Sequence, residues 1–198
     1  MTRARAHFAT LLGRGILRIG VVTIAIAPPP LASRAVTSSN PQRAVSVSTA
    51  PCTSSEYRQF DFFAGDWDTF DVGAPTKLVA RNHVTPMVGG CAIREVYEQT
   101  DGLRGESINT YDPSRQLWHQ TWVTNRGQVL LLEGKLEGDR MVLTAADRDS
   151  AGASLLRGIW WREGVTVRER AERSRDNGAS WTPVFDIVFR PHRATSRP

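Results

Sequence analysis

The sequence predicts an all-β protein, an antiparallel up-and-down β-barrel of about ten strands with a short N-terminal helix. From Gly65 onward, apolar residues alternate with a period of two rather than 3.6. Turn-forming residues recur about every 8 to 12 residues, which leaves no room for helices that cross over between parallel strands. A meander of so many short strands most economically closes on itself, because closure removes the exposed edges.

Residues 1–35 resemble a secretory signal peptide. A segment with four arginines precedes the apolar run Ile19–Ala27, and Ser33-Arg34-Ala35 places small residues at a cleavage site. A competing site at Ala25-Ile26-Ala27 is followed by Pro28, which hinders cleavage. The alternative is a retained membrane anchor, but nine apolar residues fall short of the roughly 20 that span a bilayer. We therefore expect an exported protein, periplasmic or secreted, with no stable membrane anchor after cleavage.

The net charge of +5 and pI near 9.9 would suggest a nucleic-acid partner. Five of the 25 basic residues lie in the first 35 residues, which contain no acid, so the remainder carries 20 basic and 20 acidic residues. The mature chain is therefore neutral, and a nucleic-acid partner is not expected.

The two cysteines, Cys52 and Cys91, are expected to form a disulfide in an oxidising compartment. Lipidation of Cys52 is the alternative, but Thr49-Ala50-Pro51 lacks the small residue normally found just before a lipidated cysteine. Residues 36–51 are rich in Ser, Thr and Pro and are interpreted as a flexible linker. The barrel is predicted over residues 52–192, followed by a disordered tail of residues 193–198.

Within the barrel, Ser54-Ser55-Glu56 is expected to cap a short helix that runs to Phe60, with Phe60, Phe62 and Phe63 on its apolar face. The strands that follow are expected to begin near Trp67, Leu78, Cys91, Arg104, Gln116, Gln128, Met141, Leu155, Val165 and Trp181.

The segment from Ser174 to Trp181 matches S-x-D-x-G-x-x-W, the Asp box, which has a structural role in a hairpin. Propellers need several copies of such an element, and the chain has one. His83, His119 and His192 stand singly without a His or Cys at ligand spacing, so no metal site is predicted. We expect no cofactor.

Polar and aromatic side chains share one face on several of the expected strands. If these faces turn inward, they form a binding site with aromatic walls and polar anchors; otherwise they form a solvated outer face or a self-satisfied network. The candidate ligand-binding residues are Glu95, Ser107, Asn109, Tyr111, Trp118, Gln120, Trp122, Arg168 and Glu172.

At Phe60-Asp61-Phe62-Phe63-Ala64-Gly65-Asp66-Trp67 the chain resembles a bacterial family of lipocalin-like barrels of uncharacterised function, whose domains open with F-D-F-x-x-G-x-W. The resemblance covers roughly Cys52 to Arg190. It implies a calycin-type barrel with the N-terminal helix closing one end, and it implies no particular activity. Related lipocalin and fatty-acid-binding barrels bind small hydrophobic molecules, which is an analogy of fold alone. Haem-binding barrels use an axial histidine, but His119 lies on the strand face opposite Trp118 and Trp122.

The leading functional hypothesis is a small amphipathic ligand bound inside the barrel. The first alternative is a small-molecule enzyme in which Glu95 or Glu172, desolvated beside Arg168, acts as general acid or base. The second is a structural module of the cell envelope, which predicts a closed core and an exposed apolar patch. The oligomeric state does not follow from the sequence.

Overall fold

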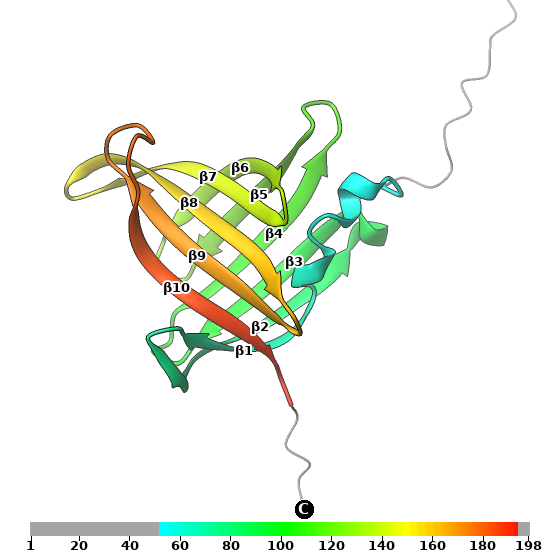
Figure 1. Cartoon of the computed structure of the whole chain (residues 1–198), viewed down its shortest axis with the longest axis horizontal. Coiled ribbons are helices and arrows are strands. Elements are labelled where there is room, and N and C mark those ends of the chain that lie inside the picture. The colour runs from blue at the N-terminus through cyan, green and yellow to red at the C-terminus, as the bar shows by residue number, and fades with distance from the viewer. Residues whose placement is uncertain (1–51, 194–198) are drawn as a thin grey trace, which may run out of the picture. The chain divides into compact units, whose positions relative to one another are not determined.

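The computed structural model describes residues 52–193; the predicted signal peptide, the linker and residues 194–198 lie outside these residues. The described chain confirms the fold class: ten antiparallel strands form a closed barrel in which each strand pairs with its neighbours in sequence and β1 pairs with β10 (Figure 1). The strands are β1 (Gly65–Asp71), β2 (Ala74–Met87), β3 (Ala92–Gln99), β4 (Arg104–Asp112), β5 (Leu117–Thr124), β6 (Val129–Glu137), β7 (Arg140–Asp149), β8 (Gly152–Glu163), β9 (Thr166–Ser174) and β10 (Thr182–Pro191).

The segment before β1 forms two short 3₁₀ turns, η1 (Ser55–Arg58) and η2 (Asp61–Phe63), rather than one capped helix. Ser54 occupies the N-cap position of η1 but makes no side-chain capping hydrogen bond. The expected apolar face is nevertheless present, because Phe60 and Phe63 are fully buried. A third 3₁₀ turn, η3 (Val88–Gly90), joins β2 to β3.

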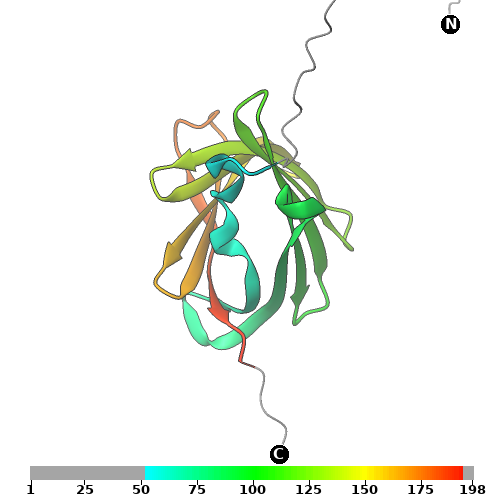
Figure 2. The same cartoon turned by 90° about the vertical axis from the view of Figure 1, so that its right-hand side faces the viewer.

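Turns of a meander alternate between the two ends of the barrel, and one of these ends is covered by η1 and η2 (Figure 2). The Phe60 ring meets Trp118 at 5.8 Å and Trp160 at 5.6 Å between centroids, and Phe63 meets Phe189 at 5.2 Å. These aromatic contacts fill the covered half of the barrel. We call it the capped end and call the opposite end the mouth.

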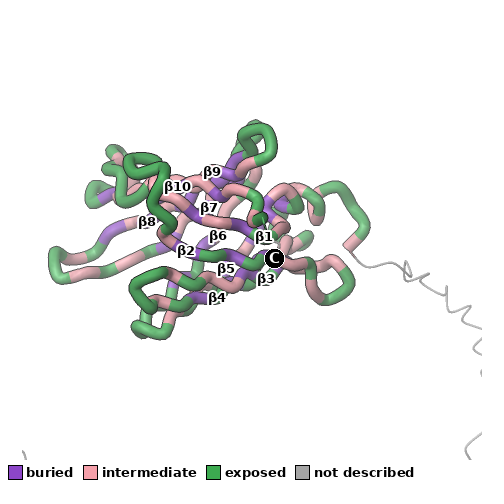
Figure 3. The backbone as a smooth tube through the Cα atoms, turned by 90° about the horizontal axis from the view of Figure 1, so that it is seen from below, coloured by how far each residue is buried: buried purple, intermediate pink, exposed green. Residues whose placement is uncertain are grey.

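Burial alternates along the strands, as a period of two requires when one face is inside the barrel (Figure 3). In β7, for example, Met141, Leu143 and Ala145 are buried, and the residues between them are only partly buried. The interior is therefore lined by alternate residues of all ten strands.

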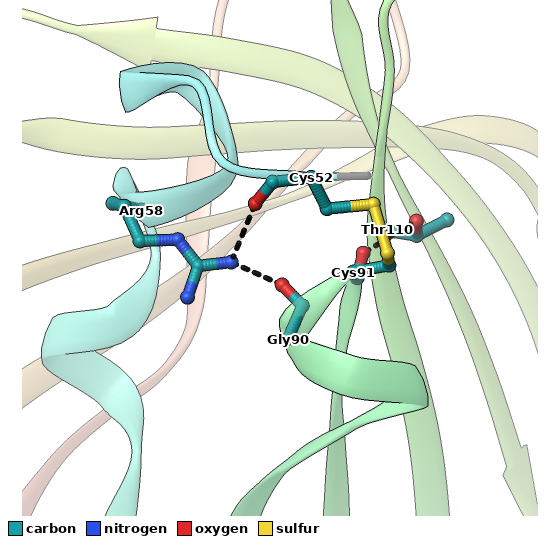
Figure 4. The surroundings of a disulfide bond; sticks show 5 residues. All are labelled: Cys52, Arg58, Gly90, Cys91 and Thr110. Atoms are coloured by element: carbon teal, nitrogen blue, oxygen red, sulfur yellow. Dashed lines mark hydrogen bonds between the residues drawn. A yellow bond between two sulfur atoms is a disulfide. The ribbon is translucent and has the colours of Figure 1, made fainter. Parts of the chain in front are cut away.

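The predicted disulfide is confirmed: Cys52 bonds Cys91 across a sequence separation of 39 residues, with the two Cα atoms 5.0 Å apart (Figure 4). It joins the chain just before η1 to the residue after η3. The Arg58 guanidinium donates hydrogen bonds to the carbonyl oxygens of Cys52 and Gly90, and Thr110 Oγ1 donates to the Cys91 carbonyl at 3.0 Å. The disulfide therefore fastens the covering turns to the capped end.

Across residues 52–193, the structure contains no helix that is long and apolar enough to cross a membrane.

Candidate binding cavity

The polar faces of three adjacent strands turn into the barrel. Glu95 of β3, Ser107 and Asn109 of β4, and Gln120 of β5 are all buried, with at most 6% of each residue's surface exposed. Ser107 lies directly opposite Glu95 in the β3–β4 register, and Asn109 lies opposite Gln120 in the β4–β5 register. This pairing brings residues that are far apart in sequence into one polar wall.

Hydrogen bonds connect this wall across five strands, with Glu95 at the centre. Asn82 Nδ2 donates to Glu95 Oε1 at 2.6 Å, and Ser107 Oγ donates to Glu95 Oε2 at 3.0 Å. Thr69 Oγ1 of β1 donates in turn to Asn82 Oδ1 at 2.6 Å. Within the described chain, the buried Asn109 Oδ1 accepts no hydrogen bond. The network is therefore extensive but incomplete.

The opposite wall, from β6 to β10, is mainly apolar. Its buried lining residues are three leucines, one isoleucine and one tryptophan: Leu130, Leu132, Leu156, Ile187 and Trp160. The Trp160 ring lies against Gly158, where an added Cβ would come within 2.2 Å of the ring carbon Cη2. A strand glycine thus leaves room for a large aromatic side chain on this wall.

Between the two walls lies a cavity of about 450 Å³, which reaches the mouth of the barrel. Its polar lining comes mainly from Asp71, Glu95, Tyr97, Gln99, Gln120, Gln128, Glu169 and Arg173. Gln99 ends β3, and Leu103 and Gln128 belong to the β3–β4 and β5–β6 connections, which lie at the mouth. The volume falls within the range of small-molecule pockets, roughly 300–1,000 Å³.

Glu95 is the most perturbed carboxyl of the polar wall. Burial raises its pKa to about 7, although the hydrogen bonds from Ser107 and Asn82 favour the ionised form and offset part of the rise. Near neutral pH this carboxyl can therefore exist in both protonation states.

Glu169 on β9 is a second carboxyl that lines the cavity, from the opposite wall. Burial raises its pKa well above the ordinary value, and the charge of Glu95 raises it further. The Trp160 indole N–H offsets part of this rise, but it forms no hydrogen bond of ordinary geometry within the described chain. The charge of Glu95 therefore disfavours ionisation of Glu169 across the cavity.

Of the nine candidate ligand-binding residues, Glu95, Gln120 and Trp122 line the cavity. Ser107 and Asn109 belong to the hydrogen-bond network around Glu95. Tyr111 lies on the same face of β4 as Ser107 and Asn109, and Trp118 lies on the same face of β5 as Gln120 and Trp122. Both lie towards the capped end. There, Trp118 Nε1 donates to Gln59 Oε1 at 3.1 Å, and the Tyr111 ring meets Tyr57 at 5.4 Å.

The orientation expected for Arg168 and Glu172 is wrong, because this face of β9 turns outward. Arg168 donates to both oxygens of Asp186 on β10, at 2.6 and 2.9 Å, and Glu172 accepts from Arg157 Nε on β8 at 2.8 Å. The inward face of β9 carries the buried Val167 and Ala171, with Glu169 between them. Burial of these apolar residues, together with ion pairing outside, selects this orientation.

Sequence reasoning missed Glu169, Trp160 and Arg173 as lining residues. A signal for Glu169 was present in the strand itself, since it lies midway between Val167 and Ala171, the two apolar residues of β9 at a spacing of four. The sequence indicated an inward position for Trp160 less clearly. Adjacent strand residues face opposite sides, and Trp160 and Trp161 are the same residue type, so the pattern does not show which of the two faces inward.

The Asp box forms the β9–β10 hairpin at the mouth. Asp176 Oδ1 accepts from the Ser180 amide at 2.9 Å, Gly178 adopts a φ of 92°, and Trp181 Nε1 donates to the Gly178 carbonyl at 3.1 Å. Hydrogen bonds from Ser180 and Ser174 lower the Asp176 pKa to about 2. These contacts have a structural role, as the motif predicts.

The outer face of β4–β6 carries four exposed apolar residues, Ile108, Val123, Val129 and Leu131, between 43% and 66% exposed. An exposed apolar face is one feature of the structural-module alternative. Its other feature, a closed core, is contradicted by the cavity.

His119 contacts Glu133 at 3.0 Å and Asp112 at 3.6 Å, away from the cavity. Among residues 52–193, no three His, Cys, Asp or Glu side chains come together as potential metal ligands.

In comparisons with known proteins, no family model matches the chain and no curated protein shows significant sequence similarity to it.

Proposed function

We propose that this protein binds a small amphipathic molecule in the barrel. The observation that carries the proposal is the cavity of about 450 Å³, with a hydrogen-bonded polar wall on one side and an apolar wall on the other. An apolar ligand body matches β6–β10, and a polar group on the ligand would meet Glu95 and Gln120. A ligand of this kind gains hydrophobic burial and directional hydrogen bonds together.

Export of the protein to the periplasm or beyond is part of the proposal. It is supported by the disulfide between Cys52 and Cys91, since such bonds persist in oxidising compartments. The resemblance to lipocalin-like barrels, whose family includes exported and cytoplasmic members, supports the binding function through the fold alone.

Filling the cavity is expected to abolish ligand binding. Ala171 is 3% exposed and lines the cavity, so Ala171→Phe places a ring within it. The measurement is fluorescence titration with prodan, a neutral amphipathic dye, for which we expect at least a tenfold loss of affinity. Thr121→Phe, on the exposed outer face of β5, is the matched control and should bind the dye as wild type does.

Equal dye binding by wild type and Ala171→Phe would show that the cavity is not the site. Native mass spectrometry of the protein purified from its own host complements this test, because a co-purified small molecule would identify the natural ligand.

A second candidate function is general acid–base catalysis on a bound small molecule. The observation that favours it is Glu95, whose pKa of about 7 suits proton transfer in either direction near neutral pH. Glu172, the other candidate acid, is ruled out by its ion pair with Arg157 on the outer face. If Glu95 is catalytic, Glu95→Gln should fail to turn over the co-purified molecule even when the variant is saturated with it; unchanged turnover at saturation excludes this role.

A further inference from the structure

Two of the carboxyls that line the cavity, Glu95 and Glu169, have no compensating cation among residues 52–193. In the described chain, neither Glu95 nor Glu169 takes part in an ion pair with a basic side chain of the protein. Arg173, the basic residue at the cavity lining, donates instead to Asp147 at 2.7 Å and to Asp149 at 3.0 Å. Arg168 and Arg170 are bound to Asp186 on the outside. Glu95 and Glu169 are therefore either ionised without a basic partner or protonated, because no basic side chain of the described chain neutralises them.

This arrangement is costly unless something else supplies the positive charge. A buried carboxylate without a partner is strongly disfavoured, so each group either takes up a proton or meets a cation. The other titratable or charged groups facing the two carboxyls are Tyr97 of β3, Asp71 at the end of β1, and Arg173 of β9. Burial and the charge of Glu169 both raise the Tyr97 pKa, so this phenol adds no competing negative charge near neutral pH.

The remaining walls suit the body of an organic cation. Trp122 and Trp160 present aromatic rings, whose faces attract cations, and Leu130, Leu132 and Ile187 offer apolar surface. Among the described residues, no third His, Cys, Asp or Glu side chain joins the two carboxyls as a potential metal ligand. A bound anion would add a further negative charge, and a neutral molecule would supply no positive charge to either carboxyl.

We propose that the ligand is an organic cation, an amine carried on an apolar or aromatic body, held between Glu95 and Glu169. The proposal rests on the binding function proposed above and specifies the chemical class of the ligand. The ammonium group supplies the missing charge, while the apolar body occupies the β6–β10 side.

The test uses three probes of similar size: 2-phenylethylamine, 2-phenylethanol and 3-phenylpropanoate, which are a cation, a neutral molecule and an anion near pH 7. Each competes with prodan for the full-length mature protein. We expect the amine to bind at least tenfold more tightly than the alcohol and the carboxylate to bind weakest. Amine affinity should also rise from pH 5 to pH 8, because binding the cation requires the two carboxyls to release protons.

Glu169→Gln and Glu95→Gln should each weaken amine binding about tenfold and leave binding of the alcohol nearly unchanged. Glu106→Gln is the control: Glu106 is 51% exposed on the outer face of β4, where it pairs with Arg94. If a glutamine variant fails to fold, proton release on wild type remains informative, measured by calorimetry in two buffers of different ionisation enthalpy.

The outcomes separate the two proposals. If the alcohol or the carboxylate binds as well as the amine while prodan still binds in the cavity, the cation proposal is overturned and the binding function stands. If neither prodan nor any of the three probes binds, the binding function itself fails.

Discussion

Replacing Cys52 and Cys91 together by serine is expected to lower the free energy of unfolding by about 4 kcal/mol. The cross-link closes a loop with a sequence separation of 39 residues, and the chain-entropy model assigns about this value to a loop of that size. The loss should be measurable by urea denaturation, with reduced wild type as a second route to the same state.

The position of the disulfide also predicts which end of the barrel is loosened when it is removed. The disulfide fastens η1 and η2 to the capped end, whereas the cavity reaches the opposite end of the barrel. The double serine variant should therefore bind prodan with wild-type affinity in buffer without denaturant. A change of less than 1 kcal/mol in unfolding free energy, or a loss of dye binding in the folded variant, contradicts this assignment.

The second large effect is on the pH dependence of stability. The Glu95 pKa is about 7 in the folded protein against an ordinary value of 4.5. Between these values the folded state binds more protons than the unfolded state, so the free energy of unfolding falls as the pH rises. Glu95 contributes stability that is fully present below pH 4.5 and is lost through pH 7, a change of about 3 kcal/mol from this group. Glu169 acts in the same direction.

Glu95→Gln removes this contribution, because an amide does not titrate. From pH 5 to pH 8, the difference in unfolding free energy between variant and wild type should shift by about 2.5 kcal/mol in favour of the variant, because part of the full change is already complete at pH 5. Urea denaturation at pH 5, 6, 7 and 8 measures this shift, and Glu106→Gln on the outer face should follow wild type. A difference between Glu95→Gln and wild type that stays constant from pH 5 to pH 8 would show that Glu95 is not desolvated in the folded protein.

The two effects are independent in origin. The disulfide acts mainly by restricting the unfolded chain, whereas Glu95 acts through the folded interior. A bound organic cation should reduce the loss of stability that Glu95 causes as the pH rises, because a cation beside Glu95 favours the ionised carboxylate. It should leave the contribution of the disulfide unchanged.

Much of the candidate site was predictable from local alternation. A period of two places Glu95, Ser107 and Gln120 each on a defined face of its strand, and the folded barrel then turns these faces inward. The register then decided which of these side chains meet, and register depends on how strands pair, which a single strand does not encode. The bond from Ser107 to Glu95 is a consequence of the β3–β4 pairing.

The same alternation failed on β9 for a physical reason. Both faces of this strand carry charged residues, Arg168 and Glu172 on one and Glu169 on the other, so hydrophobicity distinguishes them only through Val167 and Ala171. The outward face is stabilised by partners on other strands, Asp186 and Arg157, which come beside β9 only in the folded barrel.

The sequence by itself predicted the β-barrel class, the pairing of Cys52 with Cys91 and which residues of β3 to β5 share a strand face, because each depends on local periodicity or on the presence of only two cysteines. Whether those faces turn inward was decided by the closed barrel. The tertiary structure alone decided which part of the interior is filled and which remains a cavity. Trp118 and Trp122 share one strand face, yet Phe60 packs against the first, while the second lines the cavity towards the mouth. Whether an inward side chain is packed or lines a cavity depends on which distant segment lies at that height of the barrel, and the spacing of residues along one strand does not encode this.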